Sequence, residues 1–128
     1  MESERLKKIE IFSSLSDEEL EELASFAEET SIAQGDKLTK AGLHSYQLFA
    51  IEDGEVEVHR EGDTVATLGP GDVVGETGVV GRGLRNADVV AKKDVRAIFF
   101  TQDQVKKMRR DVPEVGEKLE RILEEREG

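Results

Sequence analysis

The residues between positions 75 and 87 have types that suit the binding of a nucleotide. The segment carries four glycines and two arginines between short apolar runs. Glycine lets the backbone approach a ligand closely, and a helical turn starting near Glu76 would direct free amide groups at a phosphate. Arg85 could add a two-pronged charged contact to that phosphate, and the Glu76 carboxylate could accept hydrogen bonds from a ribose hydroxyl. An anion-binding turn beside a hydroxyl acceptor indicates a nucleotide rather than a free phosphate.

The order of these residues resembles the phosphate-binding segment of the cyclic nucleotide-binding domain family, which includes the catabolite activator protein and the regulatory subunits of the cyclic AMP-dependent kinase. Gly75 and Glu76 match the opening pair of that segment, and Arg85 and Ala87 match its close at the same distance. The resemblance extends over roughly residues 6 to 126. It implies that Glu76 holds the ribose 2′-hydroxyl and that Arg85 holds the cyclic phosphate.

The predicted ligand-binding residues all lie in this segment. They are Gly75, Glu76, Thr77, Gly78, Arg82, Arg85, Asn86 and Ala87. Arg82 is either a second phosphate contact or a solvated loop charge, and Asn86 either donates to the nucleotide or serves as a turn residue.

Three positions depart from the family pattern. Leu84 stands where proline is usual, Gly78 replaces an alanine, and Asn86 replaces a small or hydroxyl residue. A structural interpretation therefore stands beside the functional one: Glu76 and Arg85 could simply pair with each other or with neighbouring residues.

A metal site is not expected. His44 and His59 are 15 positions apart in the sequence, and they lack the spacing of a two-histidine, one-carboxylate site. An enzyme of the cupin type, which shares the β-roll, is therefore the weakest of three functional hypotheses.

The elements that must position the segment follow from the periodicity of the chain. Residues 1–30 are predicted to be helical, with a capping box at Ser16–Glu19. Residues 31–101 contain short strands separated by turn signals every 8 to 12 residues, which is typical of a double-sheet jelly-roll, or β-roll. Residues 102–126 are predicted to form C-terminal helices, with a second capping box at Thr101–Gln104. The expectation is one mainly β domain with flanking helices over residues 1–128.

Apolar residues define the expected core. Five of them are assigned to packing inside the roll rather than to the ligand: Phe49, Ile51, Val73, Val74 and Val89. The stripe on the C-terminal helix either packs on the roll or caps a bound base and contacts a partner; it comprises Val115, Leu119, Ile122 and Leu123.

The charge and composition limit the function further. The formal net charge is −11 and there are no cysteines. A net negative charge opposes binding to nucleic acid, and no apolar run is long enough to span a bilayer. A cytoplasmic protein without a cofactor, a membrane partner or a nucleic-acid partner is expected.

The leading hypothesis is a non-catalytic sensor. It would bind a cyclic nucleotide, with cyclic AMP favoured over cyclic GMP, rearrange its C-terminal helix and act on an effector protein or domain. The alternative is a structural or protein-interaction module that keeps the β-roll but no longer binds nucleotide.

Overall fold

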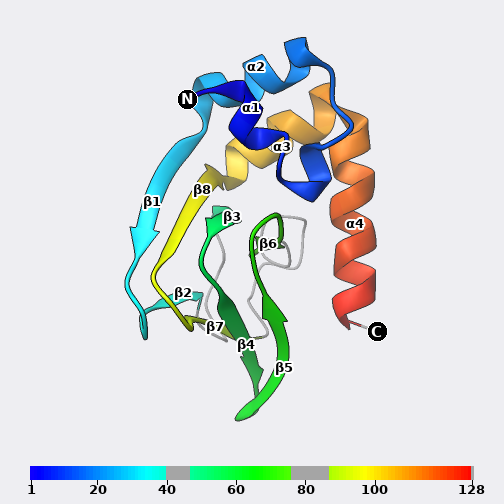
Figure 1. Cartoon of the computed structure of the whole chain (residues 1–128). Coiled ribbons are helices and arrows are strands. Elements are labelled where there is room, and N and C mark those ends of the chain that lie inside the picture. Colours follow the sequence, from blue (N-terminus) through cyan, green and yellow to red (C-terminus); the bar gives the residue numbers. More distant parts are fainter. Residues whose placement is uncertain (40–46, 76–86, 128) are drawn as a thin grey trace.

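The strands form two sheets in the computed structural model shown in Figure 1, which describes residues 1–39, 47–75 and 87–127. Among these residues, each sheet has four strands and every pairing is antiparallel. The first sheet, called sheet A, has the order β1 (Glu28–Ile32), β8 (Val95–Thr101), β3 (Gln47–Asp53), β6 (Val73–Val74). The second, sheet B, has the order β2 (Lys37–Thr39), β7 (Asp88–Ala91), β4 (Val56–Arg60), β5 (Asp63–Leu68). The predicted fold class is confirmed.

Helices precede and follow the strands. They are α1 (Ser3–Leu6), the short 3-10 helix η1 (Glu10–Phe12), α2 (Asp17–Phe26), α3 (Gln102–Asp111) and α4 (Pro113–Glu127). Figure 1 shows α1, α2 and α3 gathered at one end of the strands, with α4 running alongside the roll. No helix in the described part of the chain is long and apolar enough to cross a membrane.

Both predicted capping boxes are present. The Ser16 hydroxyl accepts from the Glu19 amide at 3.2 Å, and the Ser16 amide donates to the Glu19 carboxylate at 3.0 Å. Thr101 and Gln104 form the same reciprocal pair at 3.2 and 2.8 Å. These bonds satisfy amides that the first turn of a helix leaves free, so they fix where α2 and α3 begin.

Sheet A is covered on both faces. On β3, Leu48 and Ala50 pack with the helices, whereas Phe49 and Ile51 pack against sheet B. Successive side chains of a strand point to opposite faces. The molecule is therefore layered as helices, sheet A and sheet B, with one apolar core on each side of sheet A.

The prediction that residues 1–30 are helical is wrong at its end. Helix α2 stops at Phe26, and strand β1 begins at Glu28 and pairs with β8. The acidic pair Glu28 and Glu29 continues a helix-forming composition, but pairing with a distant strand overrides local propensity.

Candidate functional site

Most of the predicted ligand-binding residues lie outside the described part of the chain. These are Glu76, Thr77, Gly78, Arg82, Arg85 and Asn86. Gly75 and Ala87 are described and stand at the two ends of the predicted segment. The ligand-binding roles of all eight residues stay predictions, and the described residues give the frame around them.

Gly75 has a backbone conformation that suits glycine. Its φ is +93°, in the left-handed region, which a side chain with a β-carbon occupies only at a cost. It directly follows β6, where Val74 pairs with Phe49 of β3. The turn that opens the predicted segment thus needs a glycine for reasons of backbone geometry alone.

The two ends of the segment belong to different sheets. β6 lies at an edge of sheet A, whereas β7 lies within sheet B between β2 and β4. Ala87, immediately before β7, is only 7% exposed. The chain therefore leaves one layer of the roll at Gly75 and re-enters the other at Ala87.

The space between the sheets is filled by apolar side chains. They are Phe49, Ile51, Val56, Val74, Val89, Ala91, Val95 and Ala97. Phe49, Ile51, Val74 and Val89 are core residues, as predicted. Val73 is also buried, but it packs with the helices on the opposite face of sheet A.

Polar groups cluster where the segment re-enters sheet B. The Lys37 ammonium of β2 lies 3.1 Å from the Asp88 carboxylate, and His59 of β4 lies opposite Asp88 in the strand register. The His59 Nε2 is 3.7 Å from the Glu57 carboxylate. Arg60 follows at the end of β4, and sequence reasoning did not single it out.

The described residues hold no group of three His, Asp or Glu side chains arranged to bind a metal ion. Among the described residues, the one ion-pair partner of His59 is Glu57. His44 lies outside the described part of the chain.

Three residues of the apolar stripe of the C-terminal helix pack on the core of the helical layer, and the Leu123 side chain lies outside the described part of the chain. Val115 and Leu119 are fully buried, and Ile122 is partly buried against the same cluster. A cavity of about 240 Å³ lies beside this helix, where Lys118, Arg121 and Ile122 of α4 face the turn that leads into β6. Packing, the first of the two interpretations of this stripe, accounts for Val115 and Leu119.

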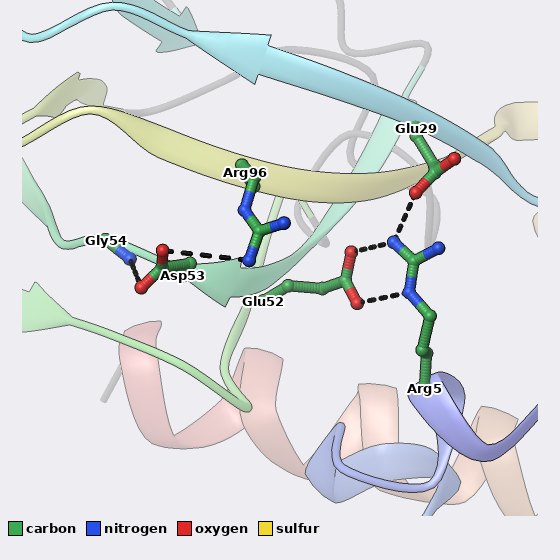
Figure 2. A network of polar contacts seen from close by, with 6 residues as sticks. All are labelled: Arg5, Glu29, Glu52, Asp53, Gly54 and Arg96. Atoms are coloured by element: carbon green, nitrogen blue, oxygen red, sulfur yellow. Dashed lines mark hydrogen bonds and ion pairs between the residues drawn. The ribbon is translucent and has the colours of Figure 1, made fainter.

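A charged network lies on the helix-covered side of sheet A. Figure 2 shows the Arg5 guanidinium of α1 paired with two carboxylates, Glu52 of β3 and Glu29 of β1. The Glu52 pair is bidentate, with Nε at 2.9 Å from one carboxylate oxygen and a terminal nitrogen on the other. These bonds, Glu52 first and then Glu29, raise the pKa of Arg5 above its usual range. The partners are 24 and 47 positions from Arg5, so no local sequence signal could have revealed the network.

Two four-stranded antiparallel sheets with flanking helices make this chain a β-roll domain. The sequence profile of the cyclic nucleotide-binding domain matches residues 29–111. This match covers more than half of the chain, and the chain belongs to the cyclic nucleotide-binding domain family.

Similar proteins include a protein kinase regulatory subunit and a catabolite activator protein. The chain is 32% identical over 96 residues to a cAMP-dependent protein kinase regulatory subunit of Schizosaccharomyces pombe, covering 74% of this chain and 23% of that protein. The Thermus thermophilus catabolite activator protein is 27% identical with a TM-score of 0.80, covering 91% of this chain and 57% of that one.

A third similar protein carries a different description. It is the regulatory subunit of a cAMP-independent protein kinase A from Trypanosoma brucei, which is 26% identical with a TM-score of 0.85 and covers 93% of this chain and 43% of that one. The chain thus spans less than two thirds of the length of each of these three relatives.

Proposed function

We propose that this domain binds a cyclic nucleotide as a regulatory sensor and has no catalytic role of its own. Glu76 would hold the ribose hydroxyl and Arg85 the cyclic phosphate, with cyclic AMP favoured over cyclic GMP. Binding would change the packing of α4, and an effector protein or domain would respond. The cytoplasmic location expected from the sequence stays a prediction.

The observation that carries this proposal is the position of the two ends of the predicted segment, at Gly75 and Ala87. The family match spans the whole segment, and the left-handed Gly75 and the buried Ala87 stand at its ends in two different sheets. A helical turn expected after Gly75 would direct free amides at a phosphate, and Arg85 would add a charged donor to it.

A second function has its own support. The structural neighbour from Trypanosoma brucei is described as cAMP-independent, and this chain departs from the family pattern at Gly78, Leu84 and Asn86. These features favour a β-roll that has become a structural or interaction module.

Isothermal titration calorimetry of the chain with cyclic AMP, cyclic GMP and AMP distinguishes the nucleotide sensor from the interaction module. We expect one cyclic nucleotide to bind and AMP to bind at least tenfold more weakly. Arg85→Ala should weaken binding by roughly 10- to 100-fold, because it removes a charge-assisted contact to the phosphate.

Arg110→Ala is the matched control. Arg110 lies on α3 with a side chain that is 73% exposed, so its loss removes the same charge from a position outside the predicted segment. Equal weakening by both substitutions would indicate a non-specific charge effect. Absence of binding to any cyclic nucleotide would favour the interaction module.

A further inference from the structure

Arg60 lies on the inward face of sheet B. It ends strand β4, in which Val56 is fully buried between the sheets and Val58 packs against the same cluster. Side chains two and four positions apart on a strand share one face, so Arg60 continues the row of Val56 and Val58. The pairing of β4 with β7 is regular up to His59 and Asp88, so Arg60 lies one position beyond the last residue paired with β7, on the side of Asp88 from which the predicted segment enters the sheet. On its other side Arg60 pairs with Asp63 of β5, after a register irregularity that follows Val58.

The Arg60 guanidinium carries a buried donor without a partner. The side chain is half-buried, and its Nε is enclosed with no hydrogen-bond partner in the described part of the chain. An unsatisfied buried donor is costly, and native structures contain few of them. An acceptor atom on a bound ligand would satisfy the Arg60 Nε at the edge of the apolar core.

The other arginines make Arg60 unusual. Among the arginine side chains that the structure describes, Arg121 is exposed and four pair with carboxylates: Arg5, Arg96, Arg109 and Arg110. The chain has 29 acidic residues, so carboxylate partners are abundant. Arg60 remains half-buried without one among the described residues.

We propose that Arg60 is a further ligand-binding residue, which donates from sheet B to acceptor atoms of the bound nucleotide. This inference rests on the proposed cyclic nucleotide function. The partner of Arg60 would be a hydrogen-bond acceptor, and a cyclic nucleotide carries acceptors on its phosphate and on its base. Phosphate oxygens accept from a guanidinium, and the N7 and O6 atoms of guanine accept from it in pairs.

Arg60→Met tests the inference with two readouts, because methionine keeps the length of the side chain and removes the donors. We expect the free variant to unfold at a temperature at least as high as the wild type, since an unsatisfied buried donor is gone. We also expect it to bind the cyclic nucleotide roughly 10- to 100-fold more weakly. Arg96→Met is the control, because its side chain is 68% exposed and binding should be unchanged.

The outcomes separate the two proposals. Equal losses for cyclic AMP and cyclic GMP indicate a phosphate contact, and a loss confined to one nucleotide indicates a contact to its base; both support the inference. Wild-type binding that Arg60→Met leaves unchanged overturns the inference and keeps the proposed function. A lowered unfolding temperature of the free variant shows that Arg60 has a structural partner, and overturns it too. If the wild type binds no cyclic nucleotide, the proposed function fails and this role fails with it.

Discussion

Glycines at different positions of this chain meet opposite demands. Gly54, in the turn between β3 and β4, has φ +96°, and a β-carbon there would lie 2.3 Å from the Asp94 carbonyl oxygen. Gly116 lies inside α4, where a β-carbon would meet the Arg109 side chain at ordinary contact distances of 3.5 Å or more. The first position excludes larger residues, whereas the second only lowers the stability of a helix.

Replacing each glycine by alanine should therefore change stability in opposite directions. Gly54→Ala should lower the free energy of unfolding by about 2 kcal/mol or more, through left-handed strain and a backbone clash. Gly116→Ala should raise it by about 0.5–1 kcal/mol, because alanine is the better helix former. Urea unfolding of both variants measures this, and a loss of stability in Gly116→Ala would contradict the account of α4.

Neighbouring cationic side chains lower the pKa of Asp111 at the end of α3. Lys107, and to a lesser extent Arg110, lower the pKa of this exposed carboxyl through hydrogen bonds. A lowered pKa in the folded state means that the ionised pair contributes stability above the usual carboxyl range, and that this contribution is lost as the pH falls through the lowered value.

An NMR titration of the carboxyl carbons should show Asp111 titrating below its usual range in the wild type. In Lys107→Met the pKa of Asp111 should move back up, because the hydrogen bond from Lys107 is lost. An unchanged titration in that variant would mean that Lys107 and Asp111 do not pair in solution.

At the scale of elements, Arg5 connects the first helix to the strands. Helix α1 has only four residues, too few to be stable alone, so tertiary contacts must hold it. Leu6 is buried in the helical core, and Arg5 pairs with Glu52 of β3 and Glu29 of β1, as Figure 2 shows. The bidentate geometry with Glu52, whose side chain is 16% exposed, makes this pair stronger than an ordinary surface ion pair.

Arg5→Ala should accordingly lower the free energy of unfolding by about 1–2 kcal/mol. Arg96→Ala is the comparison, because Arg96 and Asp53 are 3.8 Å apart and both about two-thirds exposed, and a loss below about 0.5 kcal/mol is expected there. Equal effects in urea unfolding would show that the Arg5 network is no more than a surface pair.

The sequence predicts elements well where the signal is local. Ser16 with Glu19 and Thr101 with Gln104 are three positions apart, and both form the capping boxes that start α2 and α3. The sequence does not predict strand β1, because its polar residues become a strand only by pairing with β8, whose paired residues lie 63 to 71 positions further along the chain. Long-range pairing of this kind leaves no periodic pattern in a short polar segment.

The candidate site is predictable in a similar, partial way. The order of glycines, Glu76 and Arg85 is a compact motif, and it predicts the cyclic nucleotide-binding domain family to which the chain belongs. Arg60 has no motif around it. Arg60 is a candidate because its Nε is buried without a hydrogen-bond partner among the described residues. Only the packing of the folded chain shows this.

At the scale of the whole molecule, α4 lies beside the turn that leads into β6, so a change in that turn can alter the packing of the helix. Val115 and Leu119 anchor its first half in the helical core. Further along, Ile122 and Arg121 face the turn at Gly71 and Asp72, two residues of the approach to β6 and Gly75. A ligand that changes the chain beyond Gly75 can favour one arrangement of α4 over another only if it binds the two arrangements unequally.

Hydrogen exchange of the backbone amides tests this coupling. Saturating cyclic nucleotide should change protection in the second half of α4, after Leu119, more than in α2, none of whose described residues lines the cavity beside that turn. A change confined to the strands would mean that α4 does not take part in the response.

The most direct test of the central claim is thermal unfolding of the chain with and without 1 mM cyclic AMP, cyclic GMP or AMP. A ligand at about 100 times its dissociation constant adds roughly 2.7 kcal/mol of stability, which raises the midpoint of a domain of this size by roughly 10 °C. We predict a shift of that order with one cyclic nucleotide, and a shift of at most about half that size with AMP or in Arg85→Ala, since tenfold weaker binding leaves about 1.4 kcal/mol of added stability. Unchanged midpoints with every nucleotide would contradict the sensor function and leave the β-roll as an interaction module.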